Sequence, residues 1–365
     1  RDRLFDGIAA NRVADAIPLA DLPLDLMVPA GTTAAQRDLL KLEAPLAVQS
    51  HADPGLFPIN KFSAVPLLIA SSRAASSESM AGLPYPDDVK KRLMVVPNCH
   101  VVRLATEVTG GMGRVTGVQA EVYTGQGSPA GVQASGVMVP VPEGGVVIIA
   151  QGTIESARLA LLSFQGIANY DQIGRNLMAH QRSNLTIRIP RTSLGSLDPA
   201  VKDLQASALF VKGHHAHPDG SKGYFHLQIT ASGLDRPSAD SEAELFKKIP
   251  DVDMLDQMRQ ADDTTVVLTI RGVCELQSQN PNSHVALDTA GPPDEVGAQR
   301  AFVTIAPTAE DGALWDAMDA ASDQVAKVFA GGRPFEVLAQ NNAWVAAQPG
   351  DDLRAILPYA FVADG

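Results

Sequence analysis

The stretch "TTVVLTIRGVCEL", residues 264–276, alternates between two kinds of side chain and thereby decides the fold of the second half of the chain. The apolar or small residues stand at every second position, namely Val266, Leu268, Ile270, Gly272, Cys274 and Leu276. Because successive side chains of a strand point to opposite faces, these residues share one face. One buried face and one polar face are typical of an antiparallel sheet, and the stretch therefore predicts a strand of such a sheet.

The neighbouring sequence repeats this pattern. In "YFHLQITA", residues 224–231, the apolar set is Phe225, Leu227, Ile229 and Ala231, and the polar set is His226, Gln228 and Thr230. Shorter strand-like runs occur at "LTIRIP" (185–190), "HVALD" (284–288) and "RAFVTIAP" (300–307). Residues typical of turns separate these runs, and together they predict an antiparallel sheet for the region after residue 185.

One long helix is predicted within residues 307–332. Its apolar positions recur at helical spacing and are Leu314, Met318, Ala321, Val325 and Val328. Thr308 and Asp311 have the spacing of a capping box, which marks the start of a helix. The pair Gly331–Gly332 marks its end. Such a helix has one apolar side with which it can cover a sheet.

The first half of the chain combines helical and strand-like patterns. A helix is predicted after Pro66 within residues 62–79, and strand-like runs are predicted at 93–108, 113–127 and 137–150. This mixed pattern is typical of an α/β domain. The chain therefore divides into a mixed first part and a mostly antiparallel second part.

The stretch "VVIIAQGTIESARLALLS", residues 146–163, reads as strand, tight turn and helix. Val146–Ala150 is predicted to be a strand buried on both faces. Gly152 permits a close backbone approach, and Thr153 could cap a helix whose inward side chains are Ile154, Ala157, Leu161 and Leu162. The first-turn N–H groups could meet an anionic or nucleotide ligand, or the stretch could be ordinary strand–helix packing. The residues alone leave both interpretations open.

Composition excludes some classes of protein. The 365 residues include 29 basic and 41 acidic side chains, a net charge of −12, which argues against a nucleic-acid-binding face. No apolar run is long enough for a membrane span, and the N-terminal residues show no signal-peptide pattern, so a cytoplasmic protein is predicted. Cys99 and Cys274 make no disulfide framework; buried thiols, a disulfide and a catalytic thiol all remain possible readings.

The histidines offer one candidate metal site and several structural positions. The segment "KGHHAHPDG" places His214, His215 and His217 close together, which fits either a solvated hairpin loop or two ligands of a metal. The sequence has no matching second cluster of ligands, so no metal site is predicted. Arg175 and Asn176, in "IGRNLMAH" (173–180), are expected to stabilise a crossing between domains.

Four blocks resemble one known family. In order they are "VVPNCHVVRL" (95–104), "GRVTGVQ" (113–119), "VVIIAQGTIESARLALLS" (146–163) and "IGRNLMAH" (173–180). Their order and spacing resemble the glucose–methanol–choline family of FAD-dependent oxidoreductases. The resemblance implies part of an FAD/NAD(P)-binding-type α/β domain, joined to a substrate domain in which helices back a large antiparallel sheet. The implied boundaries are a lead-in at 1–60, an FAD-binding-type domain at 61–184, a substrate domain at 185–335 and a return segment at 336–365.

The resemblance also implies a reaction and a set of site residues. The family oxidises a CH–OH group of a small alcohol or sugar by hydride transfer to flavin; the electron acceptor, oxygen or a separate carrier, is left unassigned. The cofactor-binding residues implied here are Val101, Ala150, Gly152, Asp364 and Gly365. The polar positions His226 and Gln228 are the implied substrate contacts, because the family's antiparallel sheet forms the floor of the substrate site.

Two features of the family's pattern are missing from this sequence. The chain contains no GxGxxG motif, which in the family holds the pyrophosphate of FAD, and no histidine follows His284, whereas the family places a catalytic histidine near its C-terminus. The catalytic base is therefore left unassigned, and residue 1 is expected to begin well inside the family's length. The alternative is a shortened, non-catalytic relative that acts as a binding or partner subunit.

Overall fold

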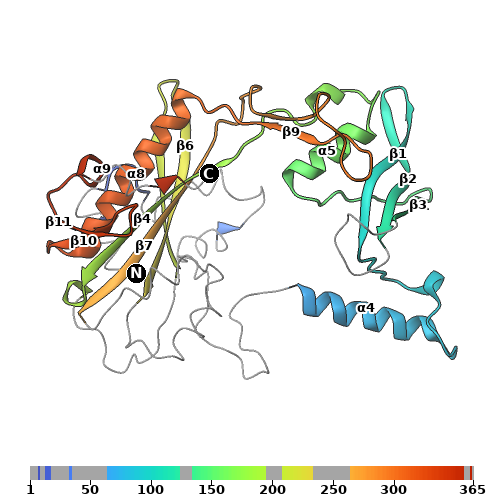
Figure 1. Ribbon diagram of the computed structural model, residues 1–365, viewed down its shortest axis with the longest axis horizontal. Helices are drawn as coiled ribbons and strands as arrows, with labels where there is room; N and C mark the ends of the chain where they lie inside the picture. The colour runs from blue at the N-terminus through green and yellow to red at the C-terminus, as the bar shows by residue number, and fades with distance from the viewer. Residues whose placement is uncertain are drawn as a thin grey trace. The chain divides into compact units, whose positions relative to one another are not determined.

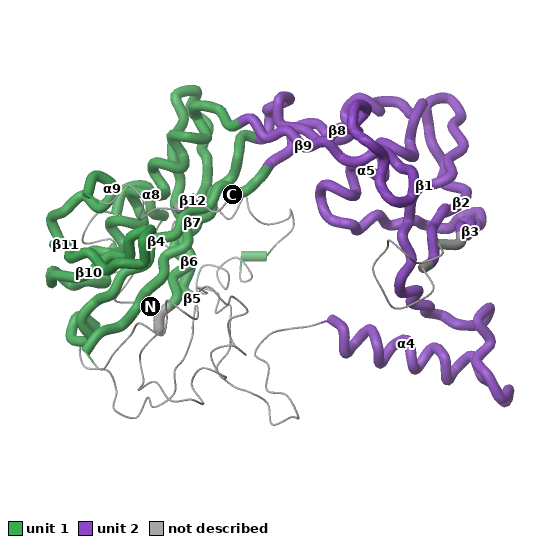
Figure 2. Tube along the Cα trace, in the orientation of Figure 1, with its two compact units in different colours: residues 1–62, 179–277, 307–365 green, residues 63–178, 278–306 purple. Residues whose placement is uncertain are grey.

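The computed structural model describes residues 7–8, 13–17, 33–34, 64–123, 134–194, 208–232, 264–356 and 362–363. The chain divides into two compact units, coloured separately in Figure 2. Unit 1 comprises residues 1–62, 179–277 and 307–365, and unit 2 comprises residues 63–178 and 278–306. Each unit is built around its own sheet or sheets.

Unit 1 is built on a seven-stranded antiparallel sheet, seen in Figure 1. Its strands are β4 (His180–Pro190), β5 (Ala208–Ala216), β6 (Lys222–Ser232), β7 (Thr265–Glu275), β10 (Phe335–Leu338), β11 (Trp344–Ala347) and β12 (Val362–Ala363). The strand order is β11-β10-β4-β7-β6-β5, and β12 also pairs with β4. The prediction of a large antiparallel sheet in the second half of the chain is confirmed.

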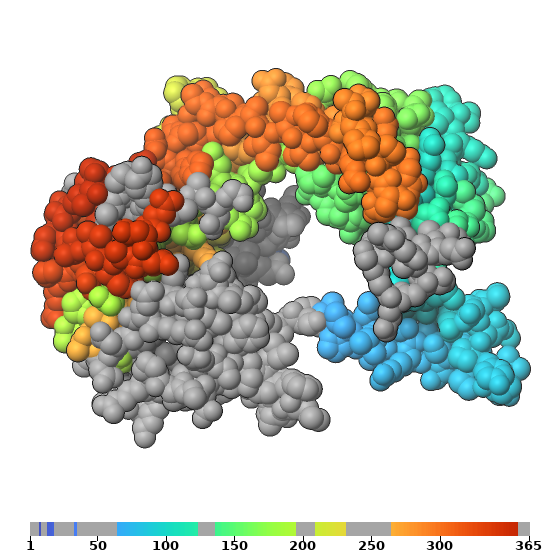
Figure 3. Space-filling model, viewed as in Figure 1, coloured from blue at the N-terminus to red at the C-terminus, as the bar shows by residue number. Residues whose placement is uncertain are grey.

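Helix α8 (Ala309–Ala330) packs on one face of this sheet. Its inward residues Met318 and Val325 are fully buried against Leu268 and Ile270 of the central strand β7 and their neighbours. The Thr308 side chain accepts a hydrogen bond from the Asp311 N–H and completes the predicted capping box, while Gly331 ends the helix in the left-handed region. In the space-filling view, α8, β10, β11 and the short helix α9 (Leu353–Ile356), coloured orange to red, form a continuous surface (Figure 3).

Truncation of the core is expected to destabilise unit 1. Leu268 is 1% exposed, and the change Leu268→Ala should cost about 3 kcal/mol, because it removes buried methyl groups and leaves a cavity. Both tryptophans, Trp315 and Trp344, lie in unit 1, so their fluorescence during denaturant unfolding measures this unit. Ile356→Ala is the control, since Ile356 is 45% exposed. Equal losses for the two variants would contradict the assigned core.

A buried carboxylate on α8 should make the stability of unit 1 depend on pH. Asp319 is 6% exposed, and burial raises its pKa to about 6, although a hydrogen bond from Ser183 acts in the opposite direction. An unfolded aspartate has a pKa near 3.9, so the folded state binds the proton more tightly and stability falls as pH rises from about 4 to about 6.

The change Asp319→Asn removes this penalty. We compare the free energy of unfolding of the variant with that of wild type. The advantage of the variant should be about 2–3 kcal/mol larger at about pH 8 than at about pH 4. Tryptophan fluorescence during guanidinium unfolding at the two pH values measures this difference. A difference between the two proteins that is the same at both pH values would show that Asp319 does not titrate as its burial requires.

The described part of unit 2 contains two α-helices and two small sheets. Its helices are α4 (Val65–Met80) and α5 (Thr153–Ser163); its strands are β1 (Cys99–Thr109), β2 (Met112–Tyr123) and β3 (Ala134–Pro140), in one sheet, and β8 (His284–Leu287) and β9 (Ala301–Thr304), in another. The 3-10 helices of the described chain are η2 (Asp88–Lys90), η4 (Tyr170–Gln172) and, in unit 1, η5 (Arg191–Leu194). The helix predicted after Pro66 is α4.

The predicted strand at Val146–Ala150 is wrong. These residues belong to no strand, and Val146 and Ile148 are 84% and 83% exposed. A buried strand needs neighbouring strands on both sides, and none of the described strands pairs with this segment. Residues 93–98 likewise precede β1 without forming a strand. Helix α5 does follow this segment, and its buried apolar residues are Leu159 and Leu161. Of the four predicted inward residues, only Leu161 is therefore buried.

The segment 278–306 groups with unit 2, whereas the sequence-based boundaries assigned it to the substrate domain. The motif "IGRNLMAH" (173–180) provides the physical reason, because two of its residues hydrogen-bond to the segment 278–306. The Val285 N–H donates to the Gly174 carbonyl at 2.8 Å, and the Leu177 N–H donates to the Ser283 carbonyl at 2.8 Å. Residues 336–347, assigned to a return segment, instead extend the sheet of unit 1.

Candidate functional site

The turn before α5 is the first candidate site, and it lies in unit 2. Gly152 has φ 80 and ψ 171, a conformation that is essentially restricted to glycine. A Cβ at this position would have no heavy atom within 4 Å, so the backbone faces open space. No described side chain caps α5, which begins at Thr153 with Gly152 as its N-cap residue, so the predicted Thr153 cap is wrong. Ala150, two residues before Gly152, is exposed.

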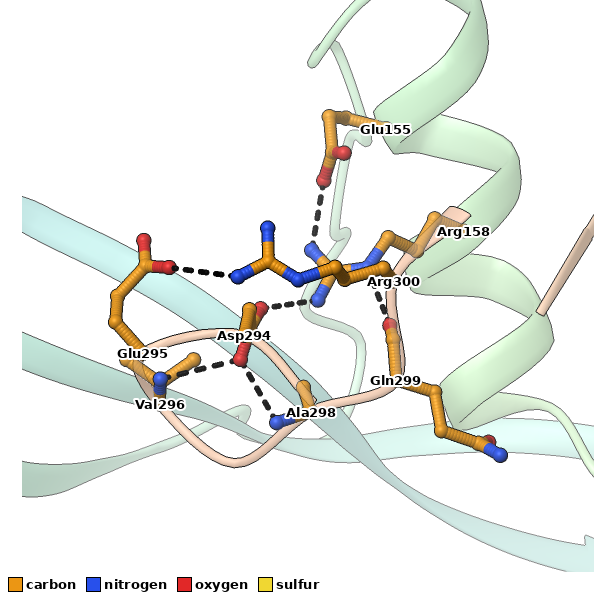
Figure 4. A network of polar contacts seen from close by, with 8 residues as sticks. All are labelled: Glu155, Arg158, Asp294, Glu295, Val296, Ala298, Gln299 and Arg300. Carbon is orange, nitrogen blue, oxygen red and sulfur yellow. Dashed lines mark hydrogen bonds and ion pairs between the residues drawn. The ribbon is translucent and has the colours of Figure 1, made fainter. Parts of the chain in front are cut away.

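Helix α5 is held in place by a buried ion pair, drawn in Figure 4. The Arg158 guanidinium contacts the Asp294 carboxylate, and these two side chains are 9% and 7% exposed. Arg158 also donates from Nε to the Gln299 carbonyl at 2.7 Å and from Nη1 to Glu155 at 3.0 Å. This network attaches the loop before β9 to α5, and thereby fixes the helix that follows the Gly152 turn.

The Asp294 carboxylate also organises its own loop. It accepts hydrogen bonds from the N–H groups of Val296 (3.1 Å) and Ala298 (2.8 Å), as Figure 4 shows. Burial opposes ionisation of Asp294, yet the Ala298 N–H, the Arg158 guanidinium and the Val296 N–H together hold its pKa below the ordinary value. Asp294 is therefore ionised at neutral pH and the ion pair is fully formed.

Of the other three residues implied for cofactor binding, the structure describes only Val101. Val101 lies half-buried in β1 opposite Ala120, beside a register shift between Val101 and Arg103. The same strand meets α5 further along, where the Leu104 N–H donates to Ser163 at 2.9 Å. No described hydrogen bond joins Val101 to Ala150 or Gly152. Asp364 and Gly365 lie outside the described residues.

The second candidate site is the sheet face of unit 1 that points away from α8. Register aligns its side chains in rows across β4, β7, β6 and β5: Arg182, Val273, His226 and Lys212 form one row, and Asn184, Arg271, Gln228 and Phe210 form the next. We call the polar face the six polar residues of these rows, Arg182, Asn184, Lys212, His226, Gln228 and Arg271. His226 and Gln228, the predicted substrate contacts, are thus brought together with four further polar side chains.

The electrostatics of this face favour a neutral imidazole. Burial first, and then the nearby His180 and Lys212, lower the pKa of His226 below its ordinary value. The His226 ring also packs against Phe210, with 5.6 Å between ring centroids. A neutral imidazole carries one hydrogen-bond donor and one acceptor, so His226 can either donate to or accept from a hydroxyl group at neutral pH.

Sequence reasoning missed the cationic members of the polar face. The predicted strand starts at Leu185 and therefore leaves out Arg182, whereas β4 starts at His180. The hairpin-loop interpretation of the histidine-rich segment leaves out Lys212, which lies in β5. Continuing the alternation of "LTIRIP" backward to His180 would have put Arg182 on the same face as Arg188.

The remaining candidates have structural environments. Cys274 is buried, donates to Gln181 at 3.3 Å, and burial raises its pKa to about 12, so it is an unreactive thiol. His217 is buried and its ring contacts Gln277 at 3.1 Å. Within the described part of the chain, His, Cys, Asp and Glu side chains do not gather into a three-ligand metal site. Within that part, too, none of the helices has the length and apolarity to span a membrane.

A scan of the chain against protein-family models gives no match, and no curated protein matches it.

Proposed function

We propose that this protein is an FAD-dependent oxidoreductase that resembles the glucose–methanol–choline family and oxidises a CH–OH group of a small alcohol or sugar. The observation that carries the proposal is the Gly152 turn, where a glycine-only conformation precedes an uncapped helix that begins at Thr153. The polar face of unit 1 gives support, because it combines hydrogen-bonding side chains on a large antiparallel sheet.

The Gly152 turn supports this proposal as the contact for the adenosine side of FAD. A Cβ at position 152 would stand in open space, so a ligand can approach the backbone there, and the first-turn N–H groups of α5 have no side-chain cap. Ala150 and Gly152 would contact the cofactor through their backbone, together with Val101. The Arg158 network keeps α5 in position for this contact.

In the proposed reaction, the carbinol carbon loses hydride and its hydroxyl group loses a proton, which leaves a carbonyl product. FAD supplies the hydride acceptor when bound. The polar face binds and orients the alcohol. The amide of Gln228 can donate and accept hydrogen bonds, and the neutral His226 ring can accept one from the substrate hydroxyl. We assign the catalytic base to no residue.

One variant pair tests the cofactor contact. Gly152→Ala should weaken FAD binding at least tenfold, because alanine at φ 80 and ψ 171 costs about 1–3 kcal/mol and shifts the backbone that meets the cofactor. Gly144→Ala is the matched control, since Gly144 has φ 77 and open space at the Cβ position but lies in a different turn. Fluorescence titration with FAD measures both affinities. Equal affinities in the two variants would remove Gly152 from the site.

A substrate screen tests the activity. FAD-loaded protein is mixed anaerobically with primary alcohols, neutral sugars and hydroxy acids, and the visible flavin band is followed. We expect at least one CH–OH compound to bleach the band through hydride transfer. FAD-loaded protein that no compound in the panel reduces would contradict the oxidoreductase.

The second candidate function is a non-catalytic binding or partner subunit. The observation that favours it is the number of exposed apolar side chains in unit 2, among them Val137, Met138 and Val139 of β3 together with Val146 and Ile148. Exposed apolar patches commonly mark protein–protein contacts. Failure to bind FAD combined with concentration-dependent association would favour this function over the first.

A further inference from the structure

The polar face carries more positive than negative charge, in a protein whose net charge is −12. Its cations are Arg182, Lys212 and Arg271, and the nearest carboxylate in the same register is Glu275, one row further along β7. Glu275 already accepts a hydrogen bond from the Tyr224 N–H at 2.9 Å. Among the described residues of this face and its neighbouring row, cations therefore outnumber carboxylates.

Two of these cations, Arg182 and Lys212, have no carboxylate within ion-pair distance among the described residues. The contrast is Arg188 on the same face, which pairs with Glu336 at 2.7 Å and stacks on Trp344. Arg182 and Lys212 stand at opposite ends of one row, three strand spacings or about 14 Å apart. An anion lying over this row would be attracted by both.

The imidazole at the centre of the row, His226, lies directly opposite Lys212 in the register of β5 and β6. Burial is the largest cause that lowers the pKa of His226, and the nearby His180 and Lys212 lower it further. The side chains between the two ends are Val273 and His226, and they add no formal charge at neutral pH. The next row supplies the amides of Asn184 and Gln228, which have both donors and acceptors suited to hydroxyl groups.

We propose that the polar face binds a small hydroxylated molecule that carries an oxyanion, either a carboxylate or a phosphate, with Arg182 and Lys212 attracting the charge and Gln228 and His226 contacting the hydroxyl groups. This inference rests on the proposed function in so far as the bound molecule is the substrate. It narrows the substrate class from alcohols and sugars in general to sugar acids and sugar phosphates.

Isothermal titration calorimetry with the 365-residue chain at physiological ionic strength tests the inference without requiring FAD. The probes are D-gluconate, D-glucose 6-phosphate and neutral D-glucose. We expect gluconate or the phosphate ester to bind at least tenfold more tightly than glucose, and the tighter of the two identifies the oxyanion. Glucose binding as tightly as both anions, or no binding of either anion, would overturn the proposal.

Charge-removing variants locate the site. The double variant R182Q/K212M should weaken anion binding at least tenfold, whereas R103Q/R114Q, which removes two exposed charges of unit 2, should leave it unchanged. Because the proposed attraction depends on charge, Arg182→Lys should retain affinity within about threefold of wild type. Equal anion affinity in both double variants would overturn the proposal. If R182Q/K212M fails to unfold cooperatively by tryptophan fluorescence, the anion affinities of the single variants R182Q and K212M are compared with that of R103Q/R114Q instead.

The outcomes separate this inference from the proposed function. Anion binding by a protein that takes up no FAD would support the polar face as a site and contradict the oxidoreductase. Flavin reduction by a neutral alcohol, with no anion binding, would support the oxidoreductase and contradict the inferred substrate class.

Discussion

Replacing Gly174 with alanine is expected to release residues 278–306 from unit 2. Gly174 has φ 79, and a Cβ there would overlap the carbonyl oxygen of Val285, which is backbone and cannot rotate away. The same contact region contains the hydrogen bond from the Val285 N–H to the Gly174 carbonyl at 2.8 Å. We expect a loss of at least about 3 kcal/mol in the stability of unit 2, from left-handed strain and the lost contact together.

Hydrogen–deuterium exchange of the peptides that contain β8, β9 and α5 measures this loss, since both tryptophans report on unit 1. The control is Gly166→Ala, because Gly166 has φ 87 but nothing within 4 Å of a Cβ, so it bears only the strain of the left-handed region, about 1 kcal/mol. Exchange that rises equally in both variants would show that the contact with Val285 is not what joins the two segments.

The second large effect is expected for Arg158→Leu. This change leaves the Asp294 carboxylate, which is 7% exposed, without its cation, and leaves the Gln299 carbonyl without its donor. Removing one partner of a buried ion pair typically costs about 3–5 kcal/mol, and we expect the lower end because the N–H groups of Val296 and Ala298 remain bound to Asp294. Exchange of the α5 and 288–300 peptides measures the loss.

A neighbouring ion pair supplies the control. Arg300 and Glu295 lie 4.0 Å apart, and their side chains are 54% and 51% exposed, so Arg300→Leu should change stability by less than about 0.5 kcal/mol. The double variant R158L/D294N should recover part of the loss, because no uncompensated charge remains buried. Similar losses in R158L and R300L would contradict the buried network of Figure 4.

The ion pair of Asp294 with Arg158 also sets the direction in which the stability of unit 2 changes with pH. Because the folded pKa of Asp294 lies below its ordinary value, its stabilising contribution is present above about pH 4 and is lost as pH falls through the folded pKa. Asp319 has the opposite effect on unit 1. Its folded pKa is raised, so its ionisation lowers the stability of unit 1 as pH rises.

The parts of the fold that sequence predicts well are those set by local periodicity. The alternation around Leu268 and Ile270, and the capping box of Thr308 and Asp311, depend on residues a few positions apart, and the structure confirms both. The prediction of a buried strand at Val146–Ala150 is wrong because burial of a strand depends on its partner strands. An apolar run by itself does not show whether partner strands are present.

In the candidate sites, too, local sequence patterns predict some features, whereas contacts between distant residues are not predicted. The Gly152 turn was marked by a single glycine at a strand-to-helix pattern, and its backbone conformation requires that residue. Arg158 could not be identified, because its partners Asp294 and Gln299 lie 136 and 141 residues further along the chain. Arg182 and Lys212 face His226 only through the registers of three strand pairs, and single-strand patterns do not specify register.

The visible absorption spectrum of the protein, recorded after incubation with FAD and gel filtration, tests the proposed flavoprotein most directly. We expect a flavin spectrum in stoichiometric amount that persists through the column and is much reduced in Gly152→Ala but not in Gly144→Ala. A colourless wild-type protein after the same treatment would contradict the flavoprotein, and would leave the polar face and the exposed apolar side chains of unit 2 as features of a binding subunit.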